Sequence, residues 1–106
     1  MRQFDVHRLV GRSAGVRPYL VIVQSNLFMR RERLLAIPLA LAAGLTDRPE
    51  ARVNPVFVIE RQTVFLETFG LGSFPLSAFG ARVQSLEDDS DRIVAALDLA
   101  MARGYG

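Results

Sequence analysis

The chain has 106 residues, of which 50% are apolar and 23% are charged, a composition that excludes a disordered tail protein. It has no cysteine, so disulfides, thiolate metal sites and cysteine nucleophiles are excluded. All 13 basic residues are arginine, and with 11 acidic residues they leave a net charge of +2, too small to indicate a nucleic-acid partner. No apolar stretch is long enough for a membrane span or forms a secretory leader, so we expect one cytoplasmic domain over residues 1–106.

The first predicted strand is QFDVHRLV at 3–10, where apolar and polar residues alternate. Phe4 and Val6 lie on one face and Asp5 and His7 on the other, as in a half-buried strand. His7 is the single histidine, and a catalytic histidine needs a positioned partner, for which Asp5 is only suggestive. The simpler interpretation is that His7 is an exposed strand residue. One histidine with scattered carboxylates also predicts no metal site, and no cofactor is expected.

Two apolar runs follow a turn-rich segment, GRSAG at 11–15. YLVIVQS at 19–25 predicts a strand that is covered on both faces. LLAIPLA at 34–40 predicts another strand, which bends or lies at an edge at Pro38 because proline cannot donate to a ladder. The segment 41–54 is compatible with a short helix or a small extra hairpin.

PVFVIERQTVFLET at 55–68 predicts a hairpin whose strands, Val56–Ile59 and Thr63–Thr68, flank a short polar turn. FGLGSFPLSAFG at 69–80 has three glycines and a proline among aromatic residues. It predicts a packed connection with no regular element. Because it opens no helix, it also does not indicate a phosphate loop.

The C-terminal part predicts one helix, from about residue 86 to about residue 103. Ser85 and Asp88 resemble a capping box, and Asp88 and Arg92 have the spacing of an i,i+4 ion pair. The apolar face of this helix is predicted to contain Ile93, Leu97, Ala100, Met101 and Gly104. Strands followed by one terminal helix predict a β-rich α+β domain.

Two charged clusters are candidate binding sites. The acidic residues of 87–91 have the composition of a cation site, but negative charge at a helix start explains them more simply. MRRER at 29–33 places Arg30, Arg31 and Arg33 around Glu32, an arrangement suited to phosphates or RNA or, more simply, to a solvated loop. No nucleophile, base and orienting residue form a catalytic set.

Six segments in order carry a resemblance to a known family. They are MRQFDVHR at 1–8, LVIVQSN at 20–26, AIPLA at 36–40, NPVFVI at 54–59, FPLSAFG at 74–80 and IVAALDLAM at 93–101. With this order and spacing the chain resembles the CcdB family, the toxins of bacterial toxin–antitoxin pairs that poison DNA gyrase. The resemblance covers nearly the whole chain, although each segment alone is short and apolar.

The resemblance implies an SH3-like, partly open antiparallel barrel with a C-terminal helix, and a symmetric homodimer. It implies a binding protein that is not an enzyme and does not read nucleic-acid sequence directly. The expected partners are the A subunit of DNA gyrase, which the toxin traps on cleaved DNA, and a cognate antitoxin that removes the toxin by coupled folding.

The resemblance also implies gyrase-binding positions. Two groups match them: Asn26, Leu27 and Phe28 after the Gln-Ser strand end, and Asp98 and Met101 on the last helix. The family ends in Trp-Gly-Ile, where this chain has Ala102, Arg103 and Gly104, followed by Tyr105 and Gly106. Alanine cannot supply the contact area of a tryptophan.

This departure leaves two interpretations of the C-terminus. In one, the helix continues and Tyr105 returns to nearly the face of Ala102, where it replaces the tryptophan. In the other, the C-terminus no longer forms the family's tryptophan contact, and the target has changed or toxicity is lost. Two further functions therefore remain open: an endoribonuclease toxin on a related barrel, with Arg30, Arg31 and Arg33 as candidate residues, and a non-toxic relic that still binds an antitoxin.

Overall fold

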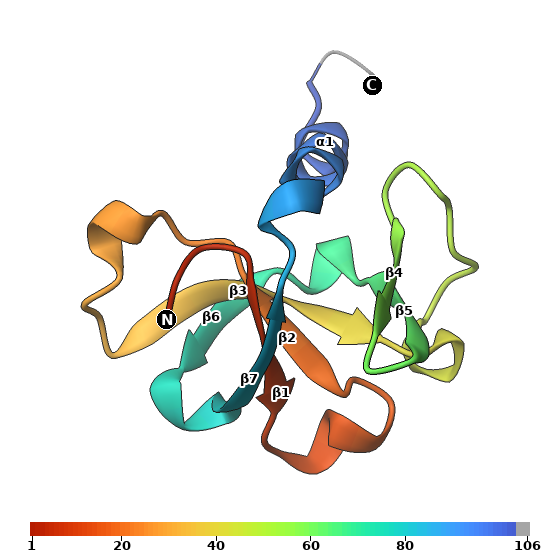
Figure 1. Ribbon diagram of the computed structural model, residues 1–106. Helices are drawn as coiled ribbons and strands as arrows, with labels where there is room; N and C mark the ends of the chain where they lie inside the picture. Colours follow the sequence, from red (N-terminus) through yellow and green to blue (C-terminus); the bar gives the residue numbers. More distant parts are fainter. Residues whose placement is uncertain (104–106) are drawn as a thin grey trace.

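A computed structural model describes residues 1–103 as one antiparallel sheet with a C-terminal helix (Figure 1). The strand order is β4-β5-β3-β2-β1-β7, and β6 pairs with β3 outside this path. The elements are β1 (Asp5–Leu9), β2 (Tyr19–Ile22), β3 (Arg33–Ala40), β4 (Val56–Ile59), β5 (Gln62–Leu66), β6 (Gly72–Pro75), β7 (Phe79–Ser85) and α1 (Ser90–Ala100). The predicted β-rich α+β class and SH3-like, partly open barrel are confirmed.

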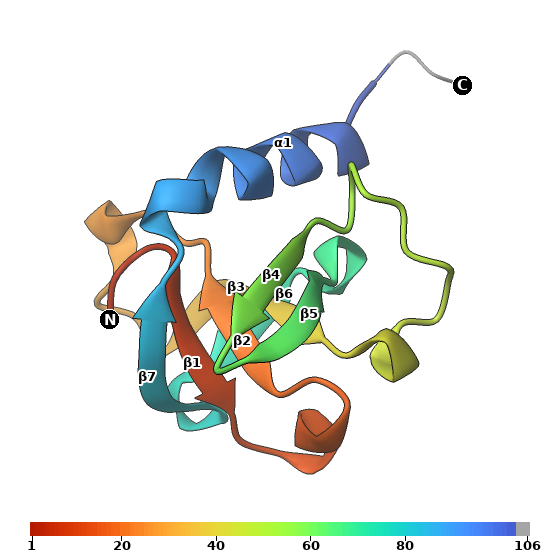
Figure 2. The ribbon, with the colours of Figure 1, turned by 45° about the vertical axis from the view of Figure 1, so that its right-hand side comes forward.

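Both faces of the central strands are buried. On one face, α1 and the β4–β5 hairpin cover a core that includes Val21, Ile37 and Ile93. On the other face, Leu20 and Leu34 belong to a second, smaller core. Figure 2 shows α1 lying across the sheet from the end of β7 toward the loop before β4. The continuous apolar run of β2 is explained by this double coverage, as predicted.

Pro38 lies inside the longest strand. β3 pairs with β2 along 36–39, so Pro38 faces Leu20, and on its other side β3 pairs first with β6 and then with β5. The Pro38 carbonyl accepts a hydrogen bond from the Glu67 N–H at 2.9 Å, so the main chain of Pro38 points away from β2. Proline has no N–H, and the position that lacks it lies between the part of β3 that pairs with β6 and the part that pairs with β5. Of the two predicted alternatives, a bend or an edge position, the edge position is wrong. Proline is tolerated inside the sheet because no strand pairs with Pro38 in the gap between β6 and β5.

The polar face of β1 is also buried, which corrects the expected half-buried strand. Asp5 and His7 are only 4% and 6% exposed, because β7 pairs with β1. Asp5 forms an ion pair with Arg82 at 3.2 Å. Nδ1 of His7 donates to the Gly80 carbonyl at 2.9 Å, and its buried Nε2 has no partner within the described residues. His7 is therefore a buried residue held by β7, and it is not the exposed residue that alternation predicts.

The segment 69–80 contains regular structure that the sequence pattern does not show. β6 lies within it, and β7 begins at Phe79. Gly80 fits a close approach, since a Cβ there would lie 3.1 Å from the Arg8 carbonyl oxygen and 3.2 Å from Val10 Cγ2. The prediction of a connection without regular elements is wrong because these strands depend on pairing with β3 and β1, which are distant in sequence.

The helix is shorter than predicted at both ends. A 3₁₀ turn, η6 (Glu87–Asp89), precedes α1, and the Ser85 hydroxyl accepts from the Glu87 N–H at 3.1 Å. The Ser85 hydroxyl therefore holds the first N–H of η6, but the N-cap residues of η6 and α1, Leu86 and Asp89, make no side-chain cap hydrogen bond. The buried residues of α1 are Ile93 and Ala96, so Ala96 replaces Met101 on the packed face.

Arg92 does not make the predicted pair with Asp88. Its guanidinium donates to the Val56 carbonyl at 2.6 Å and lies 4.4 Å from the centre of the Phe57 ring. The carboxylate of Asp89, which is one residue closer in sequence to Arg92 than Asp88 is, lies 4.0 Å from the Arg92 guanidinium. Arg92 thus links α1 to β4, because the edge of β4 offers both a carbonyl and an aromatic face.

The predicted hairpin is confirmed as β4 and β5, joined by Glu60 and Arg61. Both residues have left-handed backbones, with φ of 50° and 67°, as a two-residue type I′ turn requires. Glu60 accepts hydrogen bonds from Arg8 and, at 2.8 Å, from the Tyr19 hydroxyl. These bonds hold the side chain of Glu60 in a turn that contains neither glycine nor asparagine.

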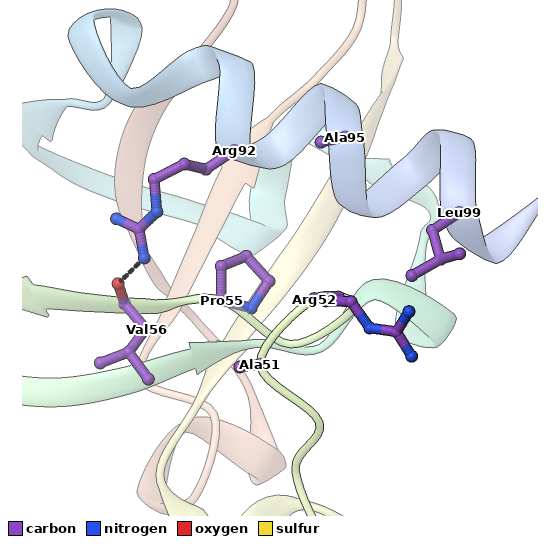
Figure 3. Close-up of a pocket in the computed structure, with 7 residues that line it drawn as sticks. All are labelled: Ala51, Arg52, Pro55, Val56, Arg92, Ala95 and Leu99. Atoms are coloured by element: carbon purple, nitrogen blue, oxygen red, sulfur yellow. Dashed lines mark hydrogen bonds between the residues drawn. The ribbon is translucent and has the colours of Figure 1, made fainter.

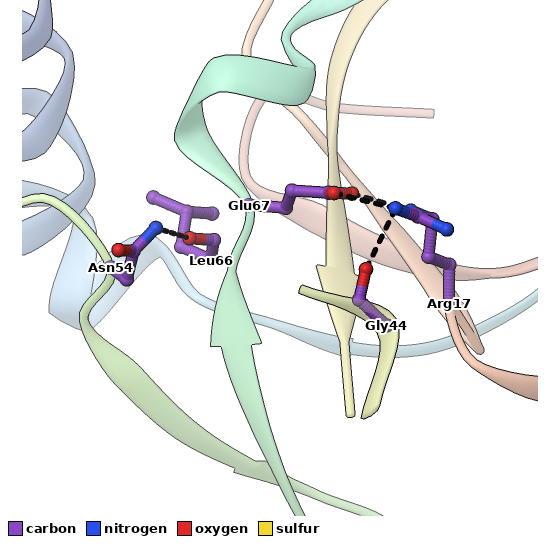
Figure 4. Close-up of polar contacts among 5 residues, drawn as sticks. All are labelled: Arg17, Gly44, Asn54, Leu66 and Glu67. Atoms are coloured by element: carbon purple, nitrogen blue, oxygen red, sulfur yellow. Dashed lines mark hydrogen bonds and ion pairs between the residues drawn. The ribbon is translucent and has the colours of Figure 1, made fainter. Parts of the chain in front are cut away.

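The segment 41–54 contains the short 3₁₀ turn Ala42–Gly44 and no extra hairpin. Arg17 forms two hydrogen bonds with Glu67, at 2.6 and 2.8 Å, and donates to the Gly44 carbonyl at 2.7 Å (Figure 4). At the other end of the segment, the Asn54 side chain donates to the Leu66 carbonyl at 3.0 Å. Both ends are therefore fixed to the sheet.

Candidate functional site

The predicted residues Leu27 and Phe28 project from a short, well-held turn. They belong to the 3₁₀ turn η2 (Asn26–Phe28) between β2 and β3, and are 86% and 53% exposed. The Ser25 hydroxyl accepts from the Leu27 N–H at 3.2 Å, and the Gln24 side chain bonds both the Phe28 carbonyl and the Leu35 N–H. The backbone of η2 is thus fixed while two large apolar side chains face solvent.

Asn26 has a different position from its neighbours. Its side-chain oxygen accepts from the Gln3 N–H at 2.8 Å, which fastens η2 to the N-terminal segment. Asn26 is itself exposed, so a partner can reach all three residues of η2. Leu27 and Phe28 are the apolar ones among them.

Arginines and an apolar groove lie next to η2. The groove has a volume of about 500 Å³, and its lining includes Val23, Phe28, Arg31, Arg33 and Leu35. The Arg31 guanidinium lies 5.7 Å from the centre of the Phe28 ring. Arg33 donates to the Ser73 hydroxyl at 3.0 Å. An exposed aromatic ring beside guanidinium groups suits planar or anionic ligands as well as protein.

The end of α1 forms the second predicted surface. Asp98, Met101, Ala102 and Arg103 are all exposed, with 63% exposure for Met101. The remaining predicted contacts, Gly104, Tyr105 and Gly106, lie outside the described residues. η2 and this end of α1 lie apart in both views of the ribbon (Figures 1 and 2).

A third surface was not anticipated from the sequence. It is a groove of about 560 Å³ between α1 and the start of β4, here called the α1–β4 groove (Figure 3). Ala51, Arg52, Pro55 and Val56 line one side, and Arg92, Ala95 and Leu99 of α1 line the other. The i, i+3, i+7 spacing of the three α1 residues is the only local signal for it.

These surfaces share exposed apolar side chains. Among residues 1–103, no three histidine, aspartate or glutamate side chains converge as metal ligands, and no helix of that part is long and apolar enough to cross a membrane. The single histidine is buried between β1 and β7. The exposed features that remain are apolar side chains flanked by arginines.

A comparison with protein-family models shows the family to which the chain belongs. The model of the CcdB family, described as CcdB protein, matches residues 3–103. The chain belongs to the CcdB family. This family of toxin–antitoxin toxins has the fold that the resemblance implied. No curated protein matches the chain.

Two solved structures share the fold of this CcdB-family chain. One is an endoribonuclease in complex with its cognate antitoxin, from Mycobacterial species, with a TM-score of 0.73 and 15% identity over 100% of this chain and 99% of that chain. The other is an endoribonuclease from Mycobacterial species, with a TM-score of 0.67 and 14% identity over 95% of this chain and 90% of that chain. At this identity the likeness concerns the fold alone.

Proposed function

We propose that this CcdB-family chain is a toxin that binds the A subunit of DNA gyrase, stabilises the complex of gyrase with cleaved DNA, and is released by a cognate antitoxin. The observation that carries the proposal is the exposure of Leu27 and Phe28 on a fixed turn. Large apolar side chains that are ordered before binding cost little entropy when a partner covers them. Their positions match the gyrase contact of the family.

The exposed end of α1 supports the same function as a second contact. Asp98, Met101, Ala102 and Arg103 offer a mixed apolar and charged surface there. Under this proposal, Tyr105 supplies the aromatic contact that Ala102 lacks, next to Gly104 and Gly106. This role of Tyr105 is a prediction from the sequence.

A homodimer would combine the two surfaces. One protomer presents η2 and the end of α1 apart from each other, whereas a two-fold axis presents each surface twice and can place one protomer's turn near its partner's helix end. Val23 and Leu35, which line the groove next to η2, give the chain an apolar surface to bury in such a dimer.

The proposal describes a binding protein without catalysis. His7 is the only histidine, and its ring is buried, with Nδ1 bonded to the Gly80 carbonyl and an edge-to-face contact to Phe79 at 5.9 Å. A histidine in this position cannot reach a solvent-borne substrate to transfer a proton.

The test is a gyrase assay with the purified chain. We expect inhibition of supercoiling and accumulation of cleaved gyrase–DNA complexes, and we expect Tyr105→Ala to weaken both. Absence of both effects would reject gyrase as the target. Unchanged potency of Tyr105→Ala in a toxic protein would reject only the role assigned to Tyr105.

The second candidate function is RNA cleavage, and it rests on the Phe28 ring beside Arg31, with Arg33 lining the same groove. Aromatic rings next to guanidinium groups stack bases and hold phosphates in single-stranded RNA. Incubation of the chain with a long RNA decides this candidate, since intact RNA would reject it. Expression without growth arrest would instead support a non-toxic relic that binds an antitoxin.

A further inference from the structure

Three exposed arginines follow η2 within four positions of the chain. Arg30, Arg31 and Arg33 have one acidic residue among them, Glu32. Three positive charges and one negative charge leave an excess of +2 on residues 30–33, which is as large as the net charge of the whole chain. The small net charge of the chain therefore does not exclude a local surface for anions.

Two hollows on this part of the surface adjoin each other. Arg31 and Arg33 line the groove next to η2. Arg30 and Arg31 line a second one, of about 490 Å³, here called the η2 hollow. Because Phe28 and Arg31 line both, the two hollows form one continuous surface. Arg30 borders it at one end, Arg31 in the middle and Arg33 at the other end.

Two of the three guanidinium groups are held by uncharged partners. Arg31 lies 5.7 Å from the centre of the Phe28 ring. Arg33 donates to the Ser73 hydroxyl at 3.0 Å and to the Ser73 carbonyl at 2.5 Å. None of the ion pairs among residues 1–103 includes Arg30, Arg31 or Arg33. A cation that a neutral group positions keeps its charge for a ligand and loses less side-chain entropy on binding.

Glu32 does not neutralise these arginines. It lines neither hollow and forms no ion pair with the part of the chain that the structure describes. Its side chain is exposed, so water and salt screen its charge. A row of guanidinium groups remains available, and such a row suits a polymer of phosphates better than a single anion.

The position of the row beside η2 indicates which polymer it meets. Leu27 is a proposed gyrase contact, and Arg30 follows it by three residues, so their Cα atoms lie within about 11 Å of each other. A gyrase surface that covers Leu27 therefore has the arginines at its rim. The polymer of phosphates that gyrase carries is its DNA.

We propose that Arg30, Arg31 and Arg33 bind the phosphate backbone of the DNA that gyrase holds, without reading its sequence. The inference rests on the proposed function for the identity of this DNA. Contacts to phosphates stabilise the complex of gyrase with cleaved DNA, while Leu27 supplies the contact with the protein. The toxin thus binds both components of the complex and catalyses no step.

A homodimer is compatible with this site. Val23 and Leu35, the apolar residues available for a dimer, line the groove next to η2 and do not line the η2 hollow. Their burial leaves Arg30 and Arg31 accessible from the η2 hollow.

The test measures binding of a fluorescein-labelled DNA duplex to the purified chain by anisotropy, without gyrase. The logarithm of the affinity should fall linearly with the logarithm of the salt concentration. Each neutralised phosphate contributes about −0.9 to the slope, so one row of three arginines predicts about −2.7. A duplex of unrelated sequence should bind equally. Absence of salt-dependent binding, or a strong preference for one sequence, would overturn the proposal.

Single substitutions locate the site. Arg30→Gln and Arg31→Gln should each weaken binding to both duplexes and reduce the slope by about 0.9. Arg12→Gln is the matched control, because Arg12 is exposed in the 3₁₀ turn η1 (Arg12–Gly15), at the opposite end of β2 from η2. It removes the same charge and should leave the slope unchanged. Equal effects of the three substitutions would overturn the proposal.

Glu32→Gln tests the sign of the local charge. It removes the single carboxylate from the row, so both duplexes should bind about twofold to fivefold more tightly. Unchanged or weaker binding would show that phosphates do not lie along residues 30–33. A polyglutamate peptide serves as competitor, and displacement of the duplex at equal charge concentration would assign the row to an acidic protein segment and overturn the proposal.

A gyrase experiment separates this inference from the proposed function. Arg30→Gln should keep its affinity for the isolated A subunit and should shorten the lifetime of the cleaved gyrase–DNA complex about threefold. Loss of affinity for the isolated A subunit would make Arg30 a protein contact and overturn the proposal. If the parent chain failed to inhibit gyrase but still bound the duplex through these arginines, the proposed function would be rejected and the phosphate contact would stand.

Discussion

Two short turns of the molecule use their side chains in opposite ways. In the β4–β5 turn, Glu60 is bonded to Arg8 and Tyr19, and the flanking strand buries Phe57 and Ile59. In η2, the backbone is fixed by polar residues, while the large apolar side chains project into solvent. The first turn therefore contributes to folding, and the second leaves its apolar surface for a partner.

This difference predicts that the β4–β5 hairpin affects stability and that η2 affects recognition. A substitution in the hairpin should change the free energy of unfolding, and a substitution of an exposed apolar side chain in η2 should change binding while the fold remains intact. Each of the following experiments tests one side of this comparison.

Ile59→Ala should have the largest effect, because Ile59 is fully buried in the main core. Truncation of a buried isoleucine costs about 2–5 kcal/mol in unfolding free energy. Val58→Ala is the matched control, since Val58 is the neighbouring residue and is 62% exposed. Its cost should stay within about 0.5 kcal/mol. Urea unfolding measures both, and equal costs would contradict the assignment of the core.

Leu27→Glu should have the next largest effect, on activity and not on folding. Loss of a central apolar anchor costs about 2 kcal/mol or more in binding, which corresponds to about thirtyfold weaker gyrase inhibition. Val10→Glu is the control, because Val10 is 58% exposed at the end of β1. The urea midpoint should be unchanged in both variants. A loss of inhibition that is equal in the two would show that η2 is not the contact.

Tyr19 makes the hairpin contacts sensitive to high pH. Burial, and then the hydrogen bond to Glu60, raise the pKa of Tyr19 to about 12, above the ordinary value of about 10. The neutral phenol is thus favoured in the folded state, so its contribution to stability is complete below about pH 10 and is lost as the pH rises toward about 12. Tyr19→Phe should lose about 1 kcal/mol at neutral pH and should lack this decline. A parallel decline in urea midpoint for both proteins would refute the assignment.

The strands that could be predicted are those whose own residues show the pattern. The apolar runs of β2 and β3 and the hairpin at 55–68 were found because burial on one or both faces is visible in the local sequence. β6 and the start of β7 were missed because a glycine-rich segment is held extended by distant partners. The burial of His7 has the same cause, since its hydrogen-bond acceptor, Gly80, and its aromatic neighbour, Phe79, both belong to β7.

The candidate surfaces likewise include one that could be predicted from the sequence and one that could not. The exposure of Leu27 and Phe28 agrees with the prediction that came from the family resemblance, although their role in gyrase binding remains a prediction. The α1–β4 groove was not predicted, because it joins residues 51–56 to residues 92–99. A groove between segments so far apart has no local signal beyond one stripe on the helix.

The smallest expected effect distinguishes the two residues of the hairpin turn. Both have positive φ, where a residue other than glycine is strained by about 1 kcal/mol. Arg61→Gly relieves this strain at an exposed side chain. Glycine also adds about 0.4–1 kcal/mol of entropy to the unfolded chain, so stability should rise by at most about 0.6 kcal/mol. Glu60→Gly relieves the same strain but removes the bonds to Arg8 and Tyr19, so its net effect should be zero or negative. Urea unfolding of the pair measures whether the side chain of Glu60 outweighs the strain of its backbone. If Glu60→Gly stabilised the protein as much as Arg61→Gly, the side chain of Glu60 would contribute nothing to the fold, and the contrast with η2 would fail.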